Sequence, residues 1–353
     1  MGKNDGSSDT NEDNNRKLKE DSRKAEEQSQ HQQEQHWAYK LFIEHPELFL
    51  PYLEQAKEKA VREVEALCKV FDEYKMPKDS KILDLSCGIG RHSIPLAKKG
   101  YKVIGYDISS LYLQKAREWA KREGLIKNND RGADESKRNN DETIKFYEGD
   151  LRDAAKILAN NGQADFDAII SMETSFGYFG EQADHQLFKD LVSISSSSSY
   201  STNSSLPSPI FVLDTINRDY LIREFQPFRI DDVSDPDVEL HIKRELNLES
   251  SSTEEEWKFY DKIRNRSEKR KEKVSTDDNA VHHLIQILDL HLNLRVYSLH
   301  ELIRLLKQAG WNCVSKYGNI ATLEPFNLGS RNMVLVSQKK NEHFGDELAK
   351  ETR

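Results

Sequence analysis

The sequence contains little cysteine, and its few cysteines cannot form a disulfide framework. The 353-residue chain has three, Cys68, Cys87 and Cys313, which are odd in number and scattered. No apolar run reaches the roughly 18 residues of a membrane-spanning helix, and the N-terminus lacks the apolar segment of a secretory signal. These absences favour a cytoplasmic protein in a reducing compartment, with no membrane association.

Positive charge is not in excess either. The chain carries 52 Lys and Arg against 61 Asp and Glu, a formal net charge of -9. This balance provides no general attraction for phosphate backbones, so nucleic acid is not the favoured partner. Hydrophobic residues make up only 36% of the chain, which means that a sizeable part of its length lies outside any packed core.

Composition divides the chain into four predicted parts. They are a disordered polar tail (1–36), a helical segment (37–80), a main domain (81–340) and a flexible tail (341–353). Within the main domain we expect insertions at about 127–142, 193–208 and 218–297. The second of these is a serine tract that predicts a flexible surface loop.

The most informative stretch is Lys81 to Ser110, which predicts a strand, a glycine turn, a helix and a second strand. Gly88 and Gly90 stand where the chain must turn tightly and let a ligand approach the backbone. The helix that follows points its free N–H groups at this turn. Asp107 ends the second strand about 20 residues later, where a carboxylate can accept hydrogen bonds from both ribose hydroxyls. This pattern is typical of a nucleotide-cofactor site.

A third glycine is missing from the turn. A dinucleotide fingerprint needs G-x-G-x-x-G, whereas Gly90 is followed by Arg91, His92 and Ser93. An NAD-linked oxidoreductase is therefore the weaker interpretation.

The run LDLSCGIGRH, with GYKVIGYDIS after it, resembles the class I S-adenosylmethionine-dependent methyltransferases of the small-molecule type. FYEGDLRD and ADFDAIISMETSFGYF resemble that family's third- and fourth-strand motifs and follow in the right order. The resemblance implies an α/β, Rossmann-like, seven-stranded and mostly parallel sheet with helices on both faces. It also implies S-adenosylmethionine as the cofactor and a small-molecule acceptor as the partner.

The resemblance further implies roles for single residues. Asp84 would lie near the methionine end of the cofactor, Asp107 would hold its ribose, and Asp150 would accept from the adenine amino group. Ser86 stands where the family has its first glycine. The full implied cofactor set is Asp84, Ser86, Gly88, Gly90, Asp107, Ile108, Asp150, Leu151 and Met172.

Methyl transfer needs few catalytic side chains, because the sulfonium methyl is already activated. If the acceptor needs a base, Glu173 and His92 are the candidates, although a hydrogen-bonded imidazole at the helix start explains His92 better. Acceptor contacts are expected, by position alone, from Thr174, Tyr178, Asn217 and Arg295. A structural ion pair would explain Arg295 equally well.

The longest insertion follows the predicted fifth strand, Ile210–Asp214, and runs for about 80 residues. Alternating residues predict antiparallel strands at Val238–Leu248 and Leu284–Tyr297, joined by a charged, solvated connection at Glu254–Lys273. Because it leaves the carboxyl edge of the parallel sheet, this insertion is expected to lie over the acceptor site. Ser298 and Glu301 then predict a capping box that begins a helix at Leu299.

Several alternatives stay open. Trp37 and Tyr39 could close over the cofactor, although packing on the sheet is the simpler expectation. His282, His283 and His291 share one strand-like segment, but no ligand set completes around them, so no metal is predicted. The chain could also be a catalytically silent module that senses S-adenosylmethionine or acts as a scaffold. The acceptor atom and the oligomeric state are not determined by the sequence.

Overall fold

The computed structural model describes residues 36–126, 143–196, 208–231, 233–235, 237–262 and 284–340. The predicted polar tail apart from His36, the insertion at 127–142, residues 197–207 of the serine tract and the C-terminal tail lie outside these described residues. So do His282 and His283.

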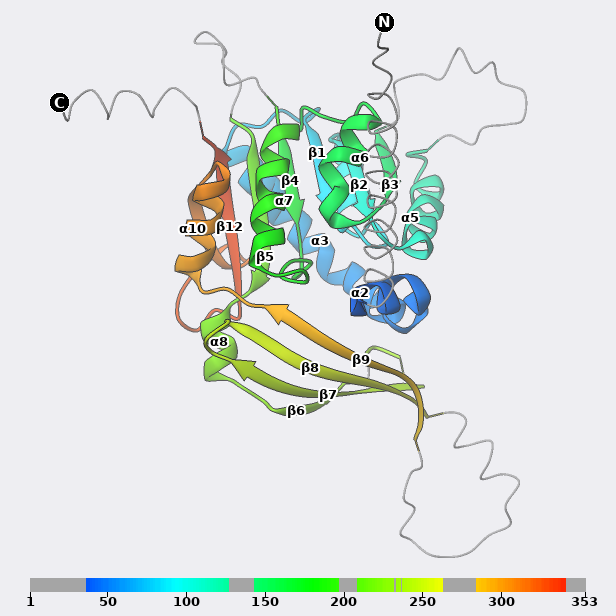
Figure 1. Ribbon diagram of the computed structural model, residues 1–353. Helices are drawn as coiled ribbons and strands as arrows, with labels where there is room; N and C mark the ends of the chain where they lie inside the picture. Colours follow the sequence, from blue (N-terminus) through cyan, green and yellow to red (C-terminus); the bar gives the residue numbers. More distant parts are fainter. Residues whose placement is uncertain are drawn as a thin grey trace, which may run out of the picture.

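A mostly parallel sheet forms the centre of the molecule (Figure 1). Its strands, in spatial order, are β11 (Glu324–Pro325), β10 (Trp311–Asn319), β12 (Asn332–Lys339), β5 (Ile210–Ile216), β4 (Ala168–Ser171), β1 (Lys81–Leu85), β2 (Lys102–Asp107) and β3 (Ile144–Glu148). The five strands from β5 to β3 are parallel, and β12 runs antiparallel to both β5 and β10. The predicted Rossmann-like fold is confirmed, and the two-residue β11 adds one strand to the seven expected.

Helices cover both faces of this sheet because its strands are apolar on both sides. In β1, Ile82 belongs to one buried cluster and Leu83 to the other, as the two-residue strand period requires. The helices on the first face are α3 (Leu50–Glu73), α4 (Ser93–Lys98) and α5 (Ser110–Arg122). Those on the second are α6 (Ala154–Asn160), α7 (Glu181–Ile194) and α10 (Leu299–Ala309). A 3-10 turn, η4 (Leu151–Asp153), precedes α6.

The predicted start of the last helix is confirmed in detail. Ser298 accepts from the backbone N–H of Glu301, and the Glu301 carboxylate accepts from the backbone N–H of Ser298. This reciprocal capping satisfies two of the N–H groups that a helix start leaves unpaired. Gly310 ends the helix with a φ of 105°, in the left-handed region that glycine tolerates.

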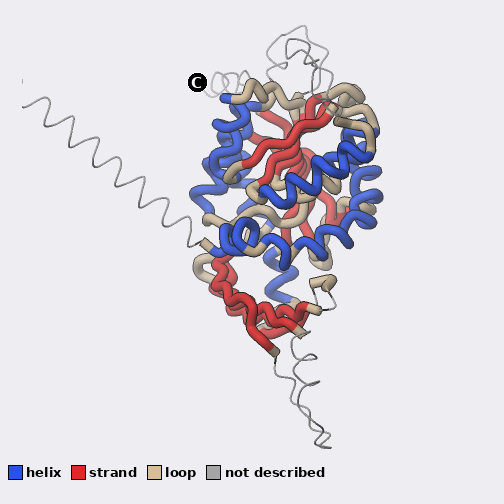
Figure 2. Tube along the Cα trace, turned by 90° about the vertical axis from the view of Figure 1, so that its right-hand side faces the viewer, coloured by secondary structure: helices blue, strands red, loops and turns tan. Residues whose placement is uncertain are grey.

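A second sheet, which we call the roof, lies beyond the edge at which the parallel strands end (Figures 1 and 2). It consists of four antiparallel strands, β6 (Phe228–Asp231), β7 (Val238–Asn247), β8 (Ser252–Asp261) and β9 (Ile285–Arg295). The short helix α8 (Arg218–Arg223) joins β5 to it. The predicted antiparallel insertion over the sheet edge is therefore present.

The prediction of a solvated connection at Glu254–Lys273 is wrong for its first part, because Glu254–Asp261 lies within β8. Every second residue of this strand faces inward, including Glu255, Trp257 and the fully buried Phe259. Glu255 is buried because Arg244 on β7 pairs with it at 2.7 Å. The acidic residues of this stretch make it look polar throughout, so the sequence does not show the alternation of inward and outward residues that defines the strand. Residues 263–273 lie outside the described part of the chain.

The N-terminal segment fills the angle between the roof and the central sheet. It forms α2 (Trp37–Tyr39), η1 (Lys40–Glu44) and η2 (Pro46–Leu48) before α3 begins. Trp37 and Leu41 are buried against Phe259 and Leu290 of the roof. Trp37 thus packs on a sheet, as the simpler interpretation expected, but the sheet is the roof and not the parallel one.

Among the described residues, no helix combines the length and the apolar character that crossing a membrane requires.

Candidate functional site

A cavity of about 660 Å³ lies between the carboxyl ends of the parallel strands, the roof and the N-terminal helices. This volume is within the range of roughly 300–1,000 Å³ that is usual for small-molecule sites. Residues at the ends of β1, β2, β4 and β5 line its base, and inward-facing residues of β7, β8 and β9 line its upper wall. Of the implied cofactor residues, those on its wall are Ser86, Gly88, Asp107, Ile108, Asp150, Leu151 and Met172.

Two implied cofactor residues, Asp84 and Gly90, do not line the cavity and instead support the turn from behind. Asp84 is buried and accepts a hydrogen bond from the Ser93 hydroxyl at the start of α4. Burial raises the pKa of Asp84. A Cβ at Gly90 would lie 3.1 Å from Ile94, so this glycine lets α4 pack closely on the turn. The turn itself has left-handed backbone at Ser86 (φ 60°) and Gly88 (φ 54°).

Asp107 connects the glycine turn to the end of β2. One carboxylate oxygen accepts from the Gly88 backbone N–H at 2.8 Å, and the other accepts from the Ser109 N–H at 2.9 Å. Burial raises the pKa of Asp107 to about 6, so the carboxylate is ionised at neutral pH. Each oxygen retains a further lone pair for a hydroxyl donor in the cavity.

Asp150 is already surrounded by donors from its own chain. Its carboxylate accepts three hydrogen bonds from Arg152 at 2.8–2.9 Å and one from the Tyr39 hydroxyl. Burial opposes ionisation, but these hydrogen bonds together lower the pKa of Asp150. Arg152 also stacks on Phe179, 4.0 Å from the ring centroid. The sequence does not reveal the role of Tyr39 because the residue lies 111 positions away from Asp150.

Glu173 lies at the end of β4 in a network of fixed charges. Arg91 donates to it at 2.6 Å and Lys59 of α3 at 2.9 Å, while its backbone is left-handed (φ 56°). Burial favours its neutral form, but the two cations outweigh burial and lower the pKa of Glu173. A carboxylate held in this way is a weak base, so the structure favours a positioning role for Glu173.

His92 is buried at the start of α4, and its Nε2 lies 2.8 Å from a carboxylate oxygen of Glu63 on α3. Glu63 also pairs with Lys59 at 3.0 Å. Burial favours the neutral acid, but His92 and Lys59 outweigh it and lower the pKa of Glu63 to about 2. The imidazole is therefore hydrogen-bonded within the fold, as the simpler interpretation of His92 expected.

We expect Glu63→Gln to reduce the free energy of unfolding by about 3 kcal/mol at pH 7, because it breaks a buried ion pair. The folded-state pKa lies below the ordinary value of 4.5, so this stabilisation is complete above pH 4.5 and disappears as the pH falls towards 2. Urea unfolding at pH 7 and pH 3 measures it. Glu65→Gln, on the exposed side of the same helix, is the matched control. Equal destabilisation by Glu63→Gln at both pH values would contradict the ion-pair explanation.

Asp214 on β5 is a cavity residue that sequence reasoning missed. It is 2% exposed, and its Oδ1 accepts from Asn332 of β12 at 2.9 Å. Burial raises the pKa of Asp214 to about 7. The signal was present, since an acid follows the apolar residues Ile210–Leu213, but an acid near a strand end often only caps the next turn.

The four predicted acceptor contacts divide into two pairs. Thr174 and Tyr178 line the cavity. The Tyr178 ring makes a T-shaped contact with Trp37, with the two ring centroids 4.7 Å apart. Asn217 does not line it, because its side chain caps α8 and donates to the Ser330 carbonyl at 2.8 Å. Arg295 borders the cavity, but its guanidinium donates to Glu181 at 2.8 Å and to Glu301 at 3.0 Å. The structure thus gives Asn217 and Arg295 partners within the fold.

The roof contributes a mixed wall of apolar side chains and one buried ion pair. Arg244 donates two hydrogen bonds to Glu255, at 2.7 and 3.1 Å. Thr253 and the Trp257 indole also donate to Glu255. The roof strands also contribute the apolar residues Leu240, Trp257, Leu292 and Leu294 to the cavity wall, together with the charged residues Arg229 and Asp231 of β6.

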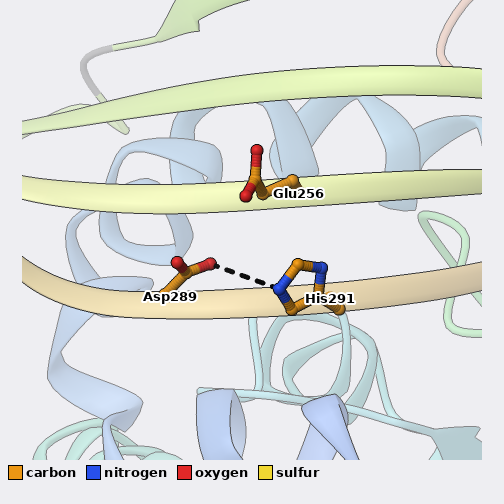
Figure 3. Close-up of side chains that lie close together, drawn as sticks. All are labelled: Glu256, Asp289 and His291. Carbon is orange, nitrogen blue, oxygen red and sulfur yellow. Dashed lines mark ion pairs between the residues drawn. The ribbon is translucent and has the colours of Figure 1, made fainter.

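Glu256, Asp289 and His291 lie close together on β8 and β9 (Figure 3). Their potential ligand atoms are within 4.8 Å of one another. Lys258 pairs with Glu256 at 2.7 Å and lies 3.9 Å from Asp289, so both acidic groups have a cationic neighbour. Of the three histidines His282, His283 and His291, the structure describes only His291. This residue lies on the exposed side of the roof.

Comparison with known proteins identifies the domain around the glycine turn. A protein-family model described as "Methyltransferase domain" matches residues 82–196. The chain is 31% identical over 112 residues to the putative methyltransferase YqeM of Bacillus subtilis, covering 32% of this chain and 36% of that protein. It is 46% identical over 80 residues to the 23S rRNA (uracil(1939)-C(5))-methyltransferase RlmD of Shewanella halifaxensis, covering 22% of this chain and 14% of that protein. The chain thus spans little more than a third, and as little as a seventh, of the length of these curated relatives.

A solved structure is similar over a longer range. An S-adenosylmethionine-dependent methyltransferase from Clostridium acetobutylicum superposes with a TM-score of 0.55 at 14% identity, covering 79% of this chain and 92% of that one. This likeness includes the mixed α/β sheet and extends beyond the matched domain. Residues 82–196 thus match a methyltransferase domain, and the chain shares its fold with this S-adenosylmethionine-dependent methyltransferase.

Proposed function

We propose that the protein binds S-adenosylmethionine and transfers its methyl group to a nucleophilic atom of a small-molecule acceptor. The observation that carries this proposal is a single cavity that runs from the glycine turn and Asp107 to the ends of β4 and β5. The implied cofactor residues and the residues of the roof therefore line one common space.

The residues present fit the cofactor. Asp107 is an ionised acceptor beside a turn whose glycine brings backbone within reach of a ligand, and Leu151 and Ile108 supply apolar wall. Asp150 lies at the end of β3, the next strand along, and is reached from the roof side by Tyr39. An adenine amino group could approach Asp150 only by replacing one of its present donors, since Arg152 and Tyr39 engage both oxygens.

S-adenosylmethionine supplies an activated methyl group, so the chain has to position the acceptor and exclude water. Arg91 and Lys59 hold Glu173 at the end of β4, which lies between β1 and β5 in the sheet. The apolar roof residues exclude water from the acceptor side, and Trp37 and Tyr178 close the cavity at the N-terminal segment.

A large nucleic acid acceptor is less well supported than a small molecule. The likeness to the rRNA methyltransferase covers 14% of that protein. A cysteine nucleophile that attacks a pyrimidine ring is not available at the turn, because burial raises the pKa of the Cys87 thiol well above its usual value. The enclosing roof also suits an acceptor small enough to share the 660 Å³ cavity with the cofactor.

Calorimetry with S-adenosylhomocysteine, followed by transfer of a labelled methyl group from S-adenosylmethionine to a small-molecule extract, tests the proposal. We expect nucleoside binding and a labelled product of low mass. Binding without any labelled product would favour the silent sensor or scaffold. Bound reduced nicotinamide, seen by its absorbance, would favour the oxidoreductase, and label found only in added RNA would contradict the small-molecule acceptor.

A further inference from the structure

One buried carboxylate oxygen in the cavity has no hydrogen-bond partner among the described residues. Oδ1 of Asp214 accepts from Asn332, but Oδ2 accepts a hydrogen bond from no residue in the described part of the chain. Asp214 is 2% exposed and lines the cavity. Its Oδ2 is not one of the completely buried side-chain atoms that lack a hydrogen bond, so this oxygen keeps some exposed surface. The oxygen therefore faces the cavity, where a ligand could donate to it.

Among the described residues, the cations near Asp214 pair with other carboxylates. Lys59 is shared between Glu173 at 2.9 Å and Glu63 at 3.0 Å, and Arg91 pairs with Glu173 at 2.6 Å. These two cations thus face two other carboxylates, and Asp214 forms no ion pair with a described residue. A buried carboxylate without a counter-ion is costly, and a cationic ligand would remove that cost.

Asp214 also lies on the acceptor side of the cavity. The predicted cofactor residues follow β1, β2 and β3, whereas Asp214 belongs to β5, which β4 separates from β1. Two strand spacings amount to about 10 Å. Asn332, on the antiparallel β12, holds the carboxylate from the side away from the glycine turn.

We infer that Asp214 binds the protonated amine of the acceptor, which makes the acceptor a primary or secondary amine of largely apolar body. This inference rests on the proposed function. Within the bound pair, the N–H bond breaks, its electron pair stays on nitrogen as the lone pair, and the proton forms an O–H bond with Oδ2. The neutral nitrogen is then able to accept the methyl group, and Asp214 returns its proton to solvent when product leaves.

The surroundings of Asp214 support such a proton transfer. Its pKa of about 7 results from burial, with Glu63 and Glu173 raising it further and Asn332 and Lys59 opposing them. A carboxylate with this pKa is closer to an amine in basicity than an exposed aspartate, which favours transfer. Ammonium binding should accordingly strengthen as the pH rises through about 7 and ionises Asp214.

A titration with benzylammonium, on protein saturated with S-adenosylhomocysteine, tests the inference without relying on turnover. Benzyl alcohol is the neutral probe of matched shape. We expect wild-type protein to bind the ammonium at least tenfold more tightly than the alcohol, and Asp214→Asn to lose that preference. Asp231→Asn, which removes another cavity-lining carboxylate on the roof, should keep it.

The outcomes separate the two proposals. Nucleoside binding in wild type and Asp214→Asn alike, with the ammonium preference lost only in the latter, supports the assignment. Nucleoside binding without any ammonium preference in wild type, or with a preference that survives Asp214→Asn, overturns the amine assignment alone. Absence of nucleoside binding contradicts the proposed function, and the assignment with it.

Acetylation of the amines in a small-molecule extract provides a second test of the acceptor class. A small-molecule extract is treated with an amine-selective acetylating reagent before the labelled-methyl assay. We expect label incorporation to fall at least tenfold after acetylation, because the nucleophilic nitrogen is lost. Incorporation that is unchanged by acetylation would overturn the amine assignment while leaving methyl transfer intact.

Discussion

Asp107→Ala is expected to weaken S-adenosylhomocysteine binding by about 100-fold or more. Hydrogen bonds to a charged acceptor contribute roughly 1.5–3 kcal/mol each, and a ribose offers Asp107 two hydroxyl donors. The substitution also leaves the Gly88 and Ser109 N–H groups without their acceptor, which loosens the turn. Isothermal titration calorimetry at pH 7.5, where Asp107 is ionised, measures the effect.

The matched control is Asp153→Ala, an exposed carboxylate near the site that does not line the cavity. Its affinity for the nucleoside should remain within about twofold of wild type, since surface charges contribute little. Thermal unfolding of each variant shows whether the protein still folds. Equal losses of affinity in the two variants would mean that Asp107 has no specific role.

Gly177→Ala is expected to reduce the free energy of unfolding by about 3 kcal/mol or more and to detach the roof from the core. Gly177 has a φ of 88°, and a Cβ there would collide with the backbone carbonyl of Arg295 at the end of β9. The collision would also break the hydrogen bond from the Arg295 N–H to the Gly177 carbonyl, now 2.9 Å long. Denaturant unfolding measures the stability, and hydrogen exchange on β8 and β9 measures the roof.

The control Gly180→Ala separates the effect of backbone strain from the effect of a steric collision with Arg295. Gly180 has a similar φ of 82°, with a ψ of 169°, but a Cβ there would meet no described atom within 4 Å. Its cost should be limited to the backbone strain of this conformation, about 1–3 kcal/mol, with no increase in hydrogen exchange on β8 and β9. If Gly180→Ala increased hydrogen exchange on β8 and β9 as much as Gly177→Ala does, the contact between Gly177 and Arg295 would not be what joins the roof to the core.

The sequence predicted the parallel sheet well because each motif that indicates it lies within a short stretch of the chain. The apolar strand Lys81–Leu85, the glycine turn and the acid at Asp107 follow one another within 30 residues. The same holds for the capping box at Ser298. Each of these features depends on backbone geometry that neighbouring residues determine themselves.

The charged part of the site could not be predicted, since its partners are far apart in the chain. Lys59 and Glu173 are 114 residues apart, and the Tyr39 hydroxyl reaches Asp150 across 111. In the sequence, Lys59 and Glu63 look like an ordinary pair on an exposed helix face. Only tertiary packing shows that α3 turns this face towards the glycine turn.

The strand β8 was missed because its composition and its alternation disagree. The letters STEEEWKFYD suggest a polar connection, yet Thr253, Glu255, Trp257 and Phe259 all face inward. Glu255 can face inward because Arg244 lies directly opposite on β7. A buried ion pair between strands leaves no signature in one strand alone.

The most direct test of the account compares S-adenosylhomocysteine with its 2′-deoxyribose analogue, each titrated by calorimetry into wild-type protein and Asp107→Ala. If Asp107 holds the ribose, wild type should prefer the hydroxylated nucleoside by at least about tenfold, or 1.4 kcal/mol, and Asp107→Ala should bind both equally. A preference of the same size in both proteins would show that the ribose lies elsewhere and would contradict the account.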